Sequence, residues 1–179
     1  MNRTAPKEKS PAVFSFRPFE VIVFFAMAMS EPKIERAYEI PFIRQFNIFM
    51  PNRVGRLNEL LAILDEAEIE VAGLSVVDSA DWAVVRMIFT NVGKAREKLT
   101  YAGVAFTESD VLAVTLHDID TLSQVCKALV AAELNIQFAY PLFLRHNDYP
   151  VLVFHTDDHV LSAKILTKRG FTLLDHEDM

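Results

Sequence analysis

The sequence predicts an α+β protein made of two tandem βαββαβ modules, each with an antiparallel four-stranded sheet and two helices on one face. Three observations lead to this prediction. From residue 42 onward, segments with the apolar spacing of a strand alternate with segments that have the spacing of a helix. The same order of segments occurs twice along the chain. Short motifs also repeat, because Leu99-Thr100-Tyr-Ala-Gly103 matches Leu166-Thr167-Lys-Arg-Gly170.

The first copy is expected to contain a strand, a helix, two strands, a helix and a closing strand. Phe46, Ile48 and Met50 alternate along the first strand, and leucines at helical spacing follow the turn after it. Gly103 stops the second helix, since glycine readily takes the left-handed conformation that ends a helix. The six elements are predicted at residues 43–50, 57–67, 71–77, 82–90, 92–102 and 104–106.

The second copy repeats this order after a short polar link, residues 107–110. Leu122 and Leu129 lie on the apolar face of its first helix, and Gly170 stops its second helix. Its elements are predicted at residues 111–116, 122–132, 135–144, 149–155, 158–169 and 171–174. Two helices on one face of a four-stranded sheet are typical of a ferredoxin-like fold. We therefore expect two ferredoxin-like domains, at residues 41–109 and 110–179.

The first 40 residues are predicted to lie outside these domains. A polar, basic start is followed by an apolar and aromatic stretch that has no counterpart in the repeat. We expect residues 1–40 to be an N-terminal extension that is disordered or not native, with translation starting at Met27 or Met29. A signal peptide is the alternative, but Pro18 and Glu20 interrupt the apolar pattern of such a peptide.

Composition limits the environment and the partners. The formal net charge of −6 argues against nucleic acid as a partner, because binding to a phosphate backbone depends on clustered Lys and Arg. Cys126 is the single cysteine, so a disulfide within the chain is excluded and a reducing, cytoplasmic location is expected. No apolar run approaches the roughly 18–20 residues that a membrane-spanning helix needs, and no membrane partner is expected.

At Asn52-Arg53-Val54-Gly55-Arg56-Leu57 and at Glu68-Ile69-Glu70-Val71, the sequence resembles the ACT domain family. The first strand of that family ends in an Asn/Asp-x-Pro-Gly-x-Leu turn, and its first helix leads into a Gly-Ile-Asn-Ile-like strand. Val54 stands where Pro is usual. The second copy keeps Leu134-Asn135-Ile136 but has Asp118-Ile119-Asp120-Thr121-Leu122 at the turn, without glycine. The resemblance covers roughly residues 42–176 and implies the tandem ferredoxin-like fold.

The resemblance implies a protein that binds an amino acid or a similar small carboxylate and regulates an enzyme without being an enzyme itself. The first turn is compatible with this role, because Gly55 permits close backbone approach and a helix N-terminus attracts a carboxylate. Asp118 and Asp120 disfavour a carboxylate at the second turn and are candidates for its helix cap. The predicted ligand-binding residues come from the first turn and the starts of two strands: Asn52, Arg53, Val54, Gly55, Arg56, Leu57, Val71, Asn135 and Ile136.

Three functions remain open from the sequence: a free-standing amino-acid sensor, a regulatory subunit similar to the acetolactate synthase small subunit, and an RNA-binding module. An RNA-binding sheet presents aromatic and basic residues, whereas residues 82–89 supply one cation, Arg86. No catalytic residue and no cofactor is predicted. No metal site is predicted either, because His155 and His159 lie across a strand-to-helix boundary and do not share a helical face. The catalytic subunit of a biosynthetic enzyme and a second copy of the chain are candidate protein partners.

Overall fold

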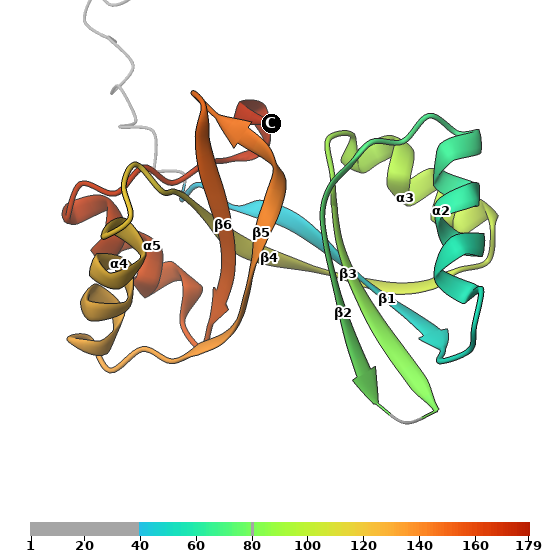
Figure 1. Ribbon diagram of the computed structural model, residues 1–179, viewed down its shortest axis with the longest axis horizontal. Helices are drawn as coiled ribbons and strands as arrows, with labels where there is room; N and C mark the ends of the chain where they lie inside the picture. Colours follow the sequence, from blue (N-terminus) through green and yellow to red (C-terminus); the bar gives the residue numbers. More distant parts are fainter. Residues whose placement is uncertain (1–39, 80) are drawn as a thin grey trace, which may run out of the picture. The chain divides into compact units, whose positions relative to one another are not determined.

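The computed structural model describes residues 40–79 and 81–179. This part of the chain contains six strands and four α-helices, and Figure 1 shows how they are arranged. The predicted extension over residues 1–40, with the alternative signal peptide, lies outside the described residues except for Ile40. The elements are β1 (Ile43–Pro51), α2 (Arg56–Glu66), β2 (Val71–Ser79), β3 (Trp82–Phe89), α3 (Val92–Tyr101), β4 (Ala105–Thr115), α4 (Thr121–Val130), β5 (Ile136–His146), β6 (Tyr149–Thr156), α5 (His159–Lys168) and η1 (His176–Asp178).

The six strands form one closed antiparallel sheet in the order β1-β3-β2-β5-β6-β4. The prediction of two separate four-stranded ferredoxin-like modules is therefore wrong. β4 pairs with β1 along its first part and with β6 along its last part, so one strand serves both halves of the fold. At the other junction, β2 and β5 meet at the pair Gly73↔Leu142, which closes the sheet. We call the elements from β1 to α3 the first half and those from α4 to α5 the second half.

β4 is continuous because the predicted polar link alternates like a strand. The Nδ2 group of Asn47 on β1 donates to the hydroxyls of Thr107 and Ser109, at 3.5 and 3.1 Å. Glu108 points the other way, where Arg96 of α3 donates two hydrogen bonds of 2.6 and 2.8 Å and thereby lowers the pKa of Glu108. Thr107, Glu108 and Ser109 thus have partners on the neighbouring strand β1 or on helix α3, and the segment continues as a strand.

The strand predicted at residues 171–174 is reduced to a single bridge between Leu173 and Val114 of β4. The predicted domain boundary, between residues 109 and 110, falls inside β4. The division into two domains stays a prediction. In the described part of the chain, no helix is long and apolar enough to cross a membrane.

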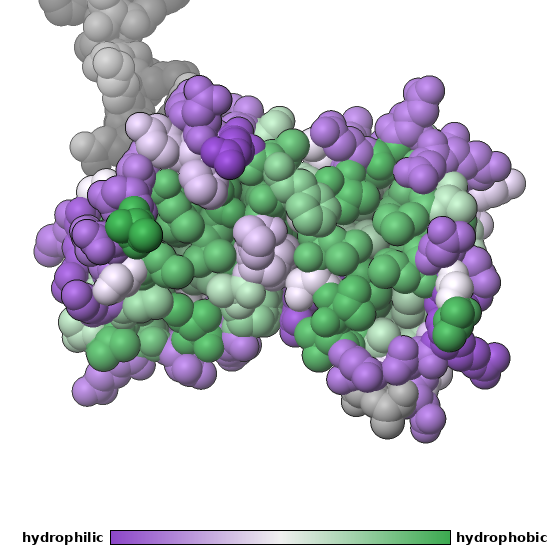
Figure 2. Space-filling view, in the orientation of Figure 1, coloured by the Kyte–Doolittle hydropathy of each residue, from purple (hydrophilic) through white to green (hydrophobic). Residues whose placement is uncertain are grey.

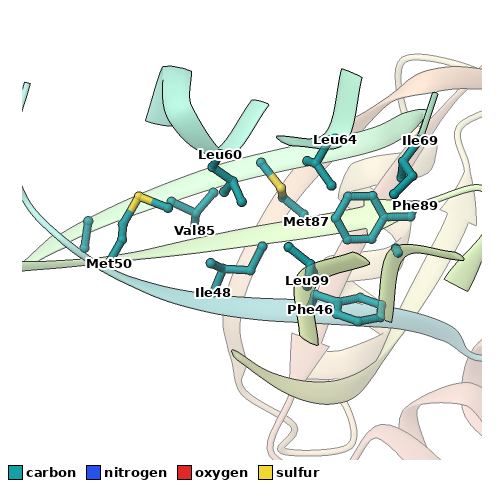
Figure 3. Packing of buried hydrophobic residues seen from close by; sticks show 12 residues of the cluster. Phe46, Ile48, Met50, Leu60, Leu64, Ile69, Val85, Met87, Phe89 and Leu99 are labelled. Atoms are coloured by element: carbon teal, nitrogen blue, oxygen red, sulfur yellow. The ribbon is translucent and has the colours of Figure 1, made fainter. Parts of the chain in front are cut away.

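Three apolar clusters stabilise the fold. In the first, side chains from β1, β3, α2 and α3 point toward one another, including the fully buried Leu64 and Phe89 (Figure 3). A second cluster is its counterpart between α4, α5, β4 and β6. The third lies on the sheet face away from the helices and joins Ile88 of the first half to Tyr140 of the second. The two halves therefore share a core in addition to a strand.

Candidate functional site

The turn between β1 and α2 is open and is built on Gly55. This residue is the N-cap of α2 and has φ 89° and ψ −16°, a left-handed conformation that glycine adopts without steric cost. No side chain among the described residues caps α2, and a Cβ atom at Gly55 would meet no heavy atom within 4 Å. The Arg56 N–H donates to the Arg53 carbonyl at 3.2 Å, whereas the next N–H groups of α2 lack a side-chain acceptor and remain available to an anion.

Charged and polar residues surround this turn. The Nη1 atom of Arg56 lies 2.5 Å from Oε2 of Glu59, one helical turn further along. The Nδ2 group of Asn52 donates to Oδ1 of Asp78 at 2.6 Å, and the Asn52 N–H donates to the carbonyl of Asp81 at 2.9 Å. These two bonds attach the start of the first turn to the β2–β3 hairpin.

A cavity of about 340 Å³ lies beside α2, next to the first turn. Arg56 and Glu59 are the charged residues of its lining. The rest of the lining comes from the end of β1, α2 and the segment before β4: Phe49, Met50, Leu60, Ile63, Ala102, Gly103, Val104 and Ala105. An apolar wall with a few polar groups is the usual composition of a small-molecule site. The positive charge of Arg56 and the negative charge of Glu59 are complementary to the two charges of a zwitterionic ligand.

The other predicted residues of the first half take different positions. Arg53 and Val54 are exposed, with Val54 fully so, while Leu57 packs against the helix-side core. Val71 pairs with Phe89 at the end of β2 that lies away from the hairpin. Strand geometry puts Val71 about 23 Å from the hairpin end of β2, where the first turn is attached. The first turn and Val71 are therefore not brought together.

The two predicted residues of the second half lie at the start of β5. The Asn135 N–H donates to Oδ1 of Asp157 at 3.2 Å, and the Asp157 N–H donates to the carbonyl of Asn135 at 3.3 Å. Ile136 pairs with Thr156 on β6. Both residues take part in joining β5 to the end of β6, and their role in ligand binding stays a prediction, as does that of the first-turn residues.

Asp118 caps the second turn. Its Oδ1 atom accepts hydrogen bonds from the N–H groups of Asp120 and Thr121, at 3.0 and 2.7 Å, and from the Thr121 hydroxyl at 2.7 Å. The bond from the Thr121 hydroxyl is the largest cause of the lowered pKa of Asp118. Asp120, the other candidate, is the N-cap residue of α4 and makes no side-chain cap bond. The Asp118 carboxylate thus caps the N-terminus of α4, whereas the N-terminus of α2 at Gly55 has no side-chain cap.

A cavity of about 550 Å³ beside the second turn was not expected from the sequence. The turn forms one side of it, and Arg145 and Tyr149 of the β5–β6 hairpin form the other. Arg145 donates to the carbonyl of Asp148 at 2.9 Å, and the His117 ring meets the Tyr149 ring edge-on at 4.7 Å. The cavity could not be found from either segment alone, because its walls are far apart in the sequence.

His155 and His159, at the strand-to-helix boundary between β6 and α5, pack against aromatic rings. The His155 ring stacks on Phe138, with 5.2 Å between centroids, and lies 6.0 Å from the His159 ring. Burial lowers the pKa of His155, and the positive charges of His159 and Arg86 lower it further. Within the described residues, no group of three His, Cys, Asp or Glu side chains is placed to hold a metal ion.

Comparison with known proteins places the chain in a family. A family model described as an ACT domain pair matches residues 42–179, whereas no curated protein matches the chain. The crystal structure of protein BT0572 from Bacteroides thetaiotaomicron is 24% identical, with a TM-score of 0.69 over 76% of this chain and 94% of that chain. The regulatory subunit of aspartate kinase from Thermus thermophilus is 10% identical, with a TM-score of 0.48 over 75% and 96% of the two chains. The first likeness shows the fold alone. Because the family model spans both halves, the chain belongs to the ACT domain pair family.

Proposed function

We propose that this chain is a regulatory protein that binds an amino acid or a similar small carboxylate at its first turn. Membership of the ACT domain pair family supports a regulatory role over a catalytic one. The observation that carries the proposal is the uncapped N-terminus of α2 at Gly55, beside a cavity lined by Arg56 and Glu59.

The ligand's charged groups have natural partners at this site. Its carboxylate accepts hydrogen bonds from the N–H groups that follow Arg56 in the first turn of α2 and from the Arg56 side chain, and the helix dipole adds to the attraction. Its ammonium group pairs with Glu59. Its side chain packs on Phe49 and Leu60, which line the apolar wall of the cavity.

The ion pair between Arg56 and Glu59 must open for this binding mode. The two side chains are 45% and 59% exposed. Ion pairs at such exposed positions contribute about 0–1 kcal/mol, because water screens them. A zwitterion that offers both residues a new partner therefore replaces the pair at small cost.

Calorimetric titration of the chain with a panel of common amino acids tests the proposal. Gly55→Asp places a negative charge at the helix N-terminus, where the carboxylate must lie. Loss of the charge-assisted hydrogen bonds should cost about 2–4 kcal/mol, or roughly 30- to 1000-fold in affinity. The left-handed conformation of residue 55 is strained for a residue other than glycine, so unfolding curves must show that the variant is still folded under the conditions of the titration.

The matched control is Asp120→Gly at the second turn. Asp118 already occupies the helix end there, so this change should leave amino-acid binding unaffected. The proposal fails if no amino acid binds to the wild type. If one binds and Gly55→Asp does not weaken it, the ligand lies elsewhere.

A second candidate is the regulatory subunit of an amino-acid biosynthetic enzyme, and exposed apolar residues favour it. Val76, Val77 and Trp82 of the β2–β3 hairpin are 48%, 40% and 57% exposed. Figure 2 shows hydrophobic residues extending over the drawn face of both halves, with hydrophilic residues mainly at the margins. Contiguous apolar surface of this kind is typical of protein-interaction sites.

Co-purification tests this second candidate. The expected outcome is an associated biosynthetic enzyme whose activity responds to the amino acid that binds in calorimetry. Trp82→Ser should release that enzyme and leave amino-acid binding intact. A chain that purifies alone, and does not change the activity of such an enzyme, would speak against it.

A further inference from the structure

A row of polar side chains crosses the first half on the sheet face away from α2 and α3. Strand register puts Thr107 opposite Asn47, Asn47 opposite Arg86, and Arg86 opposite Ser75. Residues directly opposite each other in antiparallel strands project to the same side of the sheet. Met87, next to Arg86, belongs to the helix-side core, so the row lies on the other face.

Arg86 is a partly buried cation that lacks an anionic partner. Among residues 40–79 and 81–179, no carboxylate lies within ion-pair distance of its guanidinium and no hydrogen bond engages it. By contrast, Arg44, Arg56 and Arg96 each pair with a carboxylate. The contact of Arg86 is with Phe138 of β5, whose ring centroid lies 4.0 Å from the guanidinium carbon.

The groups of the second half near Arg86 do not balance its charge. The Tyr140 hydroxyl is protonated, since burial raises its pKa, and it donates to Oε1 of Gln45 at 2.7 Å. His155 is neutral or cationic, and its pKa is lowered chiefly by burial. The Ser75 hydroxyl, opposite Arg86, also has no hydrogen-bond partner in the described part of the chain. Two unused donors therefore lie side by side on this face.

A partly buried guanidinium without a counterion is unfavourable, and a ligand that brings a negative charge relieves the cost. Phe138 lies against the Arg86 guanidinium, and no described residue accepts a hydrogen bond from the guanidinium N–H groups, which match two oxygens of a carboxylate or phosphate. We propose that Arg86 and Ser75 form an oxyanion site on this sheet face for the carboxylate or phosphate group of a small molecule.

This site is separate from the one proposed at the first turn. Arg86 pairs with Asn47 in the middle of β1, whereas the first turn lies beyond the end of β1 and against α2. Because Phe138 belongs to β5, a bound oxyanion lies where the two halves meet. It is therefore close to the junction of β2 and β5, which the pair Gly73↔Leu142 closes.

Nuclear magnetic resonance of the full chain tests the site. Sodium acetate and inorganic phosphate are titrated in turn at constant ionic strength, and the Arg86 Nε–H resonance is followed. We expect a saturable shift with at least one of the two anions. Arg86→Met, which keeps the aliphatic stem, should weaken the affinity at least about tenfold, and Ser75→Ala about two- to fivefold. Arg169→Met, at an exposed arginine, is the matched control and should have no effect.

The relative affinities identify the ligand class: tighter acetate binding indicates a carboxylate, and tighter phosphate binding indicates a phosphate. Absence of a saturable shift with both anions overturns the proposal, as does an Arg86→Met affinity equal to that of the wild type. If Arg86→Met unfolds, Ser75→Ala decides in the same way. Gly55→Asp separates this site from the first turn, because it should weaken amino-acid binding and leave the Arg86 shift unchanged.

Discussion

His176 attaches the C-terminal segment to β1 through a hydrogen bond. Its Nε2 atom accepts from the Arg44 N–H at 2.6 Å, so this nitrogen carries no proton. Burial and the charge of Arg44 lower the pKa of His176, against smaller opposite effects of Asp175 and Asp110. The folded protein therefore favours the neutral imidazole. Protonation would convert the acceptor into a donor that faces another donor.

This geometry predicts that the His176 contribution to stability depends on pH. The pKa in the folded state lies below the ordinary 6.5, so the contribution is complete above pH 6.5 and is lost as the pH falls through the lowered pKa. Urea unfolding of the wild type and His176→Phe between about pH 5 and 8 measures it. The stability difference should shrink on acidification. A difference that stays constant would contradict the prediction, and His117→Phe, at an exposed histidine, is the control.

At the scale of the element, the four α-helices of the described residues end in the same way. A residue in the left-handed conformation follows each helix, with φ between 50° and 85°. The N–H of the next residue then donates to a carbonyl in the last turn of the helix at 3.0 Å. The left-handed residues are Glu68, Gly103, Glu133 and Gly170. Glutamate thus occupies two positions where glycine is the favoured residue.

The left-handed residue after each helix predicts opposite effects of two substitutions on the free energy of unfolding. Glu133→Gly should raise the free energy of unfolding by about 0.5–1 kcal/mol, because relief of left-handed strain exceeds the entropy that glycine costs. Gly170→Ala should lower it by about 1 kcal/mol. The added Cβ at Gly170 would meet no atom within 4 Å, so the effect isolates backbone strain. Denaturant unfolding measures both changes. If the two variants changed the free energy of unfolding in the same direction, the explanation would be contradicted.

At the scale of the whole molecule, Gly73 controls closure of the sheet. A Cβ atom added there would lie 2.6 Å from Cδ2 of Leu142 and 3.4 Å from Cε2 of Tyr140. Leu142 and Tyr140 are themselves buried, which limits how far the Leu142 side chain can turn away, so Gly73→Ala should destabilise the protein by about 1–3 kcal/mol through overpacking. In the control Gly93→Ala, in α3, the nearest atom is 3.7 Å away and helix propensity favours alanine. Unfolding curves in urea that show no loss for Gly73→Ala would mean that the Leu142 side chain turns away without cost.

The shared core predicts that neither half folds alone. A fragment that ends near residue 110 would expose Ile43 and Ile88, and a fragment that starts there would expose Tyr140 and Val153. Each should aggregate, self-associate or stay partly unfolded. Sedimentation and hydrogen exchange measure this. Two stable, monomeric fragments would show instead that the β4 junction is dispensable.

The sequence by itself determined the local elements and the family. Helix and strand periods located the strands of the first half and the ends of the helices, including Gly103 and Gly170, whose left-handed conformation is confirmed. The ACT resemblance at the first turn is confirmed by the family model. These features depend on neighbouring residues, on backbone freedom and on side-chain periodicity, all of which a sequence displays directly.

Tertiary structure alone decided how the two copies join. The polar residues 107–110 form a loop or a strand according to the partners they find, and Asn47 and Arg96 supply those partners from distant segments. In the same way, Arg86 is an ordinary strand residue in the sequence. It becomes a candidate site because strand register leaves it without a carboxylate and the closed sheet puts Phe138 over it. Pairing between distant segments depends on register and closure, which local patterns do not contain.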